Sequence, residues 1–142
     1  MAFTGNYACN AFKTGMMNGA FNFTSGSFKI ALYTNAATLD ATTAAYTPVG
    51  EAVAAGYTAG GQTLVVTQVP TTGASGTTAY VSFGNTSWAG AITARGALIY
   101  LDNGTTNPAV CVLDFGADKT SSGLFTVQFP AVSNSSAIIR LS

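Results

Sequence analysis

Residues 97–113 read ALIYLDNGTTNPAVCVL, two apolar runs separated by a polar segment that begins Asp102-Asn103-Gly104. An Asn-Gly pair between apolar runs is a strong hairpin signal, because both residues tolerate the positive φ that the tight turn requires. The first run extends back over 92–101 and contains Gly96, which marks a bulge or bend inside a strand. The second run extends over 109–115 and alternates in hydropathy. The stretch therefore predicts a hairpin of two antiparallel strands.

The same alternation recurs on both sides of this pair. In residues 28–33, Phe28, Ile30 and Leu32 share one strand face, and Lys29, Ala31 and Tyr33 share the other. Further strands are predicted at 62–69 (ended by Pro70, which has no N–H for a ladder), 78–83, 124–129 and 137–141, with an eighth strand if 49–53 pairs. Short strands separated by turn residues predict an all-β fold, an antiparallel β-sandwich of jelly-roll-like type, in a single domain spanning 1–142.

One short N-terminal helix is predicted beside the strands. Ala8, Phe12 and Met16 recur at a spacing of four residues and form one apolar stripe. Asn6 is a candidate N-cap, and Gly19 is suited to the left-handed conformation that ends many helices. The whole segment 1–23 either packs on the sandwich or extends from it as an arm.

The composition excludes several classes of protein. Charged residues make up 7% of the chain, against about 25% in a typical soluble domain, and five basic side chains balance five acidic ones. No basic field exists to hold nucleic acid. The chain is 48% hydrophobic, which argues against disorder, and it has no apolar run of about 20 residues that would cross a membrane. The N-terminus has no basic start followed by an apolar stretch, so no secretory signal is predicted.

Side chains that usually carry catalysis are scarce. The chain has no histidine, which removes the usual Ser-His-Asp and Cys-His systems and the commonest metal ligand. Asp114 and Asp118 form the one candidate carboxylate pair or calcium site, and the alternative is a turn at 116–119 in which they bond nearby backbone. We therefore predict no enzyme activity, no catalytic residue, no cofactor and no metal.

The two cysteines are far apart in the sequence and show no metal or redox spacing. Cys9 and Cys111 are predicted to be separate thiols buried as small apolar side chains. A disulfide between them is the alternative that the sequence leaves open.

Four aromatic residues are candidates for a protein interface. Trp88 lies in the polar segment 85–90, where it would either anchor a partner or fold back to plug one end of the sandwich. Phe3, Tyr7 and Phe12 belong to an aromatic-rich N-terminal region that would either pack on the sheet or dock on a partner.

Several segments together resemble a known group of proteins. They are FKIALYT at 28–34, GYTAGG at 56–61, ARGALIY at 94–100, VLDFGADK at 112–119, FTVQFP at 125–130 and AIIR at 137–140. Over nearly its whole length the chain is similar to small virion proteins of tailed bacteriophages. These motifs are strand and turn segments without a catalytic signature, and the resemblance carries over no functional residues.

The resemblance implies a capsid cement or decoration protein with a jelly-roll-like fold. Its partners would be the major capsid protein, at whose junctions on the outer shell it would bind, and further copies of itself in a dimer or trimer. It would be made in the host cytoplasm and end on the virion. If segment 1–23 is an arm, its deletion should abolish shell binding and leave the core folded. The alternative is a tail- or fibre-associated adaptor or a receptor- or glycan-binding module, with Trp88 and Tyr57 as the candidate aromatic pair.

Overall fold

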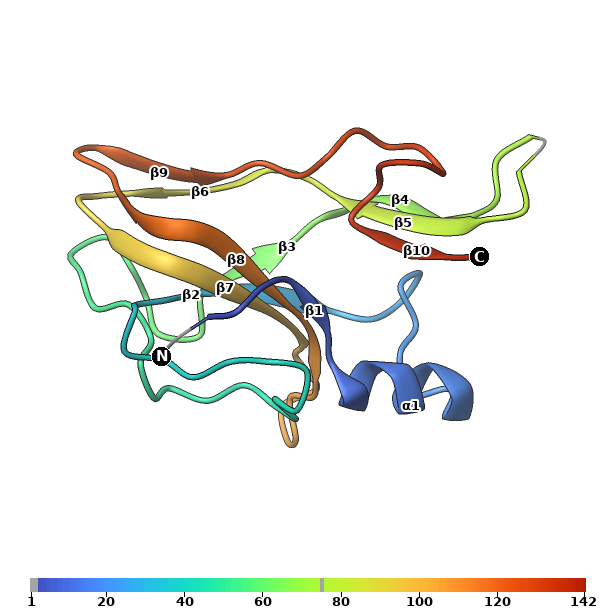
Figure 1. The fold of residues 1–142 in the computed structure, drawn as a ribbon, viewed down its shortest axis with the longest axis horizontal. Helices are drawn as coiled ribbons and strands as arrows, with labels where there is room; N and C mark the ends of the chain where they lie inside the picture. The colour runs from blue at the N-terminus through green and yellow to red at the C-terminus, as the bar shows by residue number, and fades with distance from the viewer. Residues whose placement is uncertain (1–2, 75) are drawn as a thin grey trace.

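The computed structural model describes residues 3–74 and 76–142 (Figure 1). Met1 and Ala2 of the predicted N-terminal segment, and Ser75 of a predicted polar loop, lie outside the described residues. The elements in chain order are β1 (Tyr7–Ala8), α1 (Asn10–Asn18), β2 (Phe28–Tyr33), β3 (Gln62–Leu64), β4 (Val66–Thr71), β5 (Ala79–Phe83), β6 (Thr86–Ala89), β7 (Thr93–Leu101), β8 (Ala109–Thr120), β9 (Leu124–Val127) and β10 (Ile139–Leu141).

The strands form two layers. One layer is a five-stranded sheet in the order β1-β8-β7-β2-β3, and the other consists of the sheets β10-β5-β4 and β6-β9. Figure 1 shows the second layer running above the first, with α1 below its β4-β5-β10 end. The described strand pairs are antiparallel. The predicted all-β antiparallel sandwich is confirmed, whereas the jelly-roll connection of its strands stays a prediction.

The β7–β8 hairpin folds back over itself to start the second layer. Its ladder continues beyond both strands, because the Ser121 N–H donates to the Ile92 carbonyl at 2.9 Å and the Gly90 N–H donates to the Gly123 carbonyl at 2.9 Å. Beyond these bonds, the segment before β7 and the segment after β8 both turn back over the five-stranded sheet, where they pair as β6 and β9. The apolar side chains that alternate along the ribbon therefore face each other across the sandwich.

The space between the layers is filled mainly by aromatic rings. This aromatic core contains Phe12, Phe21, Phe23, Phe28, Phe83, Trp88 and Phe125, together with Ile30, Leu32, Ile92, Ile99 and Val110. Phe23 and Phe28 stack with ring centroids 4.6 Å apart. Burial of large rings at native packing density is the main source of stability on this side of the sheet.

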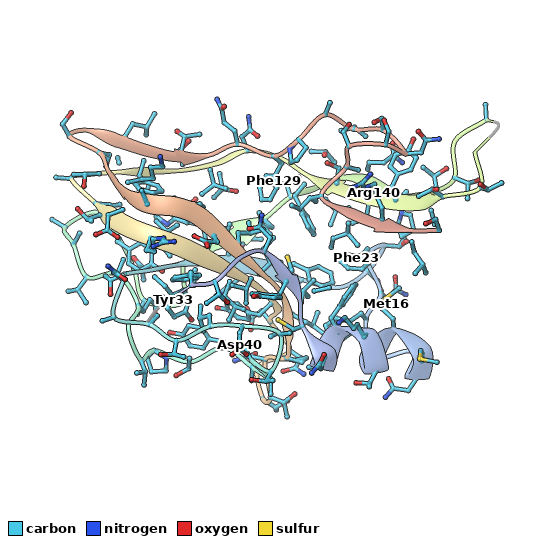
Figure 2. All side chains as sticks on the ribbon, viewed as in Figure 1. Met16, Phe23, Tyr33, Asp40, Phe129 and Arg140 are labelled. Atoms are coloured by element: carbon cyan, nitrogen blue, oxygen red, sulfur yellow. The ribbon has the colours of Figure 1, made fainter. Side chains whose placement is uncertain are left out.

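The opposite face of the five-stranded sheet has a core of its own. This tyrosine core contains Phe3, Cys9, Ala31, Tyr33, Ala37, Leu39, Leu98, Tyr100, Ala109 and Val112. The long connection between β2 and β3 covers it without forming strands of its own. Figure 2 shows Phe23 and Phe129 above the five-stranded sheet and Tyr33 below it. The predicted division of β2 between two faces is correct, and both of those faces are buried.

The N-terminal segment is part of the folded domain. Its residues Phe3, Cys9, Phe12, Phe21 and Phe23 are buried, and β1 pairs with β8. Of the two alternatives for this segment, residues 3–23 take the packed one. Because the deletion of this segment would remove aromatic rings from both cores, we expect it to destabilise the whole domain rather than leave the core folded.

The helix begins later than predicted. The N-cap is Cys9, and the Oδ1 atom of Asn6 instead accepts a hydrogen bond from the Asp114 N–H at 2.6 Å. Gly19 ends the helix at φ 79°, as predicted. Gly15 is buried against the Phe21 ring, which leaves no room for a Cβ atom at this position.

Two predicted strand boundaries are wrong for local reasons. The run 62–69 divides at Val65 into β3 and β4, and β4 continues through Pro70 because it is an edge strand, where a missing N–H costs no ladder bond. The predicted loop 116–119 is a bulge within β8, where the register with β7 shifts and Gly116 takes φ 82°. The bulge predicted at Gly96 is confirmed by the same register shift.

Candidate functional site

The predicted interface residues lie mostly inside the protein. Phe3, Phe12 and Trp88 are buried, and Trp88 is 1% exposed in strand β6 rather than in a polar loop. Tyr7 is half-buried, and its hydroxyl bonds to the Thr4 hydroxyl at 2.7 Å. The packed alternative that the sequence left open is the one that the structure shows for the three buried residues. They present little ring surface to a partner.

The carboxylates are dispersed. Asp114 pairs with Arg95 at 3.0 Å, while Asp118 is exposed on the bulge of β8. Asp102 pairs with Lys29 at 3.3 Å. Within the described residues, no group of three or more His, Cys, Asp or Glu side chains is placed to hold a metal ion.

The most organised polar cluster surrounds Glu51, which is 7% exposed. Its Oε1 atom accepts hydrogen bonds from the Tyr57 hydroxyl at 2.6 Å and the Gly60 N–H at 2.7 Å, and its Oε2 atom accepts one from the Tyr46 hydroxyl at 2.7 Å. The Tyr57 oxygen itself accepts the Leu32 N–H at 2.9 Å, so its own proton is free to point at Glu51. The carboxylate therefore ties the covering connection to strand β2.

Two further tyrosines extend the cluster through backbone carbonyls. The Tyr100 hydroxyl donates to the Gly60 carbonyl and the Tyr33 hydroxyl to the Thr47 carbonyl, both at 2.7 Å. Burial raises the pKa of Tyr100 to about 12, and the nearby negative charges of Asp102 and Glu51 add to this shift. Burial and the Glu51 carboxylate likewise raise the pKa of Tyr33. These hydroxyls are therefore protonated at neutral pH and act as hydrogen-bond donors.

The two cysteines are free and buried, as predicted. Cys9 belongs to the tyrosine core and Cys111 to the aromatic core. Burial raises the pKa of Cys9 to about 11, with a further contribution from Asp40, and burial also raises the pKa of Cys111. Both thiols are protonated at neutral pH and lack the thiolate character of a nucleophile.

Two grooves border strand β8. One lies between β8 and β9, has a volume of about 450 Å³ and is lined by Phe115, Leu124 and Phe125 among others. The second, of about 360 Å³, lies between β1, β8 and residues 130–140 and includes Arg140. Neither groove is lined by an acidic side chain. Both grooves are open to solvent.

The surface of the protein as a whole carries few charged side chains and several exposed apolar ones. Among the described residues, the charged side chains outside the two ion pairs and the Glu51 cluster are Lys13, Asp40, Asp118, Lys119 and Arg140. The exposed large apolar residues are Met16, Met17, Val49, Val53, Val65, Val69, Leu124, Val132 and Leu141. No helix among the described residues is long and apolar enough to span a bilayer.

No family model, curated protein or solved structure matches this chain.

Two features of the structure have little signal in the sequence. Glu51 stands out only as the one acid in a run that has Tyr46 and Tyr57 close by on either side. Strand β9 belongs to an uncharged alternating segment, 123–129, which predicts a strand without indicating that one of its edges is free.

Proposed function

We propose that this chain is a non-enzymatic structural protein of a tailed-phage virion that binds the outer capsid surface where major capsid proteins meet. The observation that carries the proposal is the nearly uncharged surface, in which side chains of Thr, Ser and Asn are interspersed with exposed apolar residues. Such surfaces associate readily, because they have little net charge to keep copies and partners apart.

Three structural properties support this role. The sandwich has a well-filled core on both faces of its central sheet, so it would transmit load as a rigid body. Its grooves are open and border strand edges, as a broad protein contact requires. A weak contact repeated over a shell gains strength by multivalency, so each copy needs only a modest interface.

The proposed partners are the major capsid protein and further copies of this chain. A nucleic-acid partner has no support, because the described cations that lack ion pairs are only Lys13, Lys119 and Arg140. The glycan-binding alternative loses its aromatic platform, since Trp88 is buried and the Tyr57 hydroxyl is engaged by Glu51 and Leu32.

Cryo-electron microscopy of the intact particle, with copy number, tests the proposal. We expect many copies at regular positions on the shell. A few copies confined to the tail or neck would contradict the cement role and favour a tail adaptor.

A further inference from the structure

We propose that strand β9 pairs with β9 of a second copy of this chain, so that the two β6–β9 ribbons join into one four-stranded sheet across a two-fold axis. This inference rests on the proposed function in one respect. The proposed function includes self-association, and the pairing would supply the surface for it. The β6–β9 sheet has two strands, which is fewer than a stable sheet normally has.

The hydrogen-bond ladder shows which backbone groups of β9 face outward. The Gly90 N–H bonds to the Gly123 carbonyl, so this pair and every second pair after it, including Trp88 with Phe125, exchange hydrogen bonds between β6 and β9. The N–H and C=O groups of the alternate residues Leu124 and Thr126 therefore point away from β6.

The same alternation explains a contact on the other side of the ribbon. Ser87 stands opposite Thr126, so its carbonyl points away from β9, and the side-chain amide of Gln62 donates to it at 2.8 Å. The outer edge of β6 is thus covered from within the chain. For Leu124 and Thr126, the described contacts include no backbone partner on the outer edge of β9.

The other outer strands are protected against pairing. Strand β4 contains Pro70 and two register shifts, β1 has two residues, and β3 and β10 have three each. Proline, bulges and short length are the devices by which edge strands avoid other chains. Strand β9 has no proline, no charge and no register shift.

The edge of β9 is complementary to itself. A two-fold axis through Phe125 places Leu124 of one copy opposite Thr126 of the other, so the outward groups of both residues meet in hydrogen-bonding pairs. The segment 123–129 carries no charge, so no like charges oppose each other. Leu124, which is 62% exposed, would gain a cross-strand neighbour.

The adjoining groove favours the same partner. It runs beside β9 between the two layers and is lined by Phe115, Leu124 and Phe125. A strand added to β9 would extend the upper layer over this groove and remove apolar surface from water. Lys119 borders the groove, but Asp118 precedes it, so the local net charge is balanced.

Sedimentation velocity of the full-length chain over a wide concentration range tests this pairing. We expect a monomer–dimer equilibrium that Thr126→Pro weakens about ten- to hundredfold, because it removes one interchain N–H donor from each copy. Thr126→Val is the matched control. Both variants lose the hydroxyl contact with Ser87, but Val keeps the N–H and should dimerise like the wild type.

Hydrogen exchange gives a second readout that does not depend on the proline variant folding. In the wild type, the Leu124 and Thr126 amides should exchange fast at low concentration and become protected as the dimer forms. The Phe125 and Val127 amides should be protected throughout. A wild-type chain that stays monomeric, or a dimer in which the Leu124 and Thr126 amides stay unprotected, would overturn the pairing. Since the experiment uses the isolated chain, its result is separate from whether the protein occupies a capsid.

Discussion

The two faces of the five-stranded sheet are covered by different kinds of structure and are held in different ways. Strands and α1 cover one face, and the core there consists of stacked and edge-on aromatic rings. Irregular chain covers the other face, and the core there is bonded through tyrosine hydroxyls and Glu51. Strands satisfy their own backbone groups, whereas an irregular cover must find partners for its N–H and C=O groups in side chains.

The comparison explains the one buried carboxylate. A buried charge is costly unless hydrogen bonds satisfy it, and Glu51 receives three, all of them from residues of the cover. The aromatic core has no such network. Its buried Trp88 Nε1 atom has no hydrogen-bond partner within the described residues.

The largest effect is expected in the aromatic core. Trp88→Ala should lower the free energy of unfolding by about 3–5 kcal/mol, because it leaves a large cavity between the layers. Trp88→Phe should cost about 1–2 kcal/mol, since it keeps most of the ring and removes an N–H that has no partner. Urea unfolding followed by circular dichroism measures both. An alanine variant as stable as the wild type would show that Trp88 does not support the core.

A smaller effect is expected in the tyrosine core. Glu51→Gln should lower the free energy of unfolding by about 1–3 kcal/mol, because the amide replaces charge-assisted hydrogen bonds with neutral ones and places NH₂ near a hydroxyl donor. Asp118→Asn removes the same charge from an exposed position and should change stability by less than about 0.5 kcal/mol. If both variants changed the free energy of unfolding equally, the hydrogen bonds of Glu51 would add nothing to stability beyond the effect of removing one negative charge.

The sequence predicts the apolar framework of this fold better than its polar contacts. Alternation at Phe28, Ile30 and Leu32 correctly assigns one face of β2, since hydrophobic periodicity depends only on neighbours in the chain. The sequence leaves the position of Trp88 open, because its polar neighbours suit a turn as well as a short strand.

The contacts that the sequence cannot supply are those between distant segments. Asn6 looks like a helix cap, but its side chain is taken by the Asp114 N–H from β8. The free edge of β9 depends on which side β6 occupies, and the outward direction of Leu124 follows only from the ladder register. Neither fact has a local sequence signal.

The smallest expected effect is a difference in local opening between the two faces, and the cysteines report it. Cys9 packs under the irregular cover, where its thiol contacts the Asp40 carbonyl at 3.9 Å, and Cys111 lies in the aromatic core. Because burial raises the pKa of both thiols, neither should react with iodoacetamide in the native protein at pH 8.

In urea below the unfolding transition, we expect Cys9 to be alkylated before Cys111. A loop cover opens locally more readily than strands that pair on both sides. Mass spectrometry of peptides after timed labelling measures the two rates, and Cys9→Ser and Cys111→Ser variants assign them. If the rates stay equal at every urea concentration, the two faces open as one cooperative unit. The Glu51 network would then hold its cover as firmly as the strands hold the aromatic core.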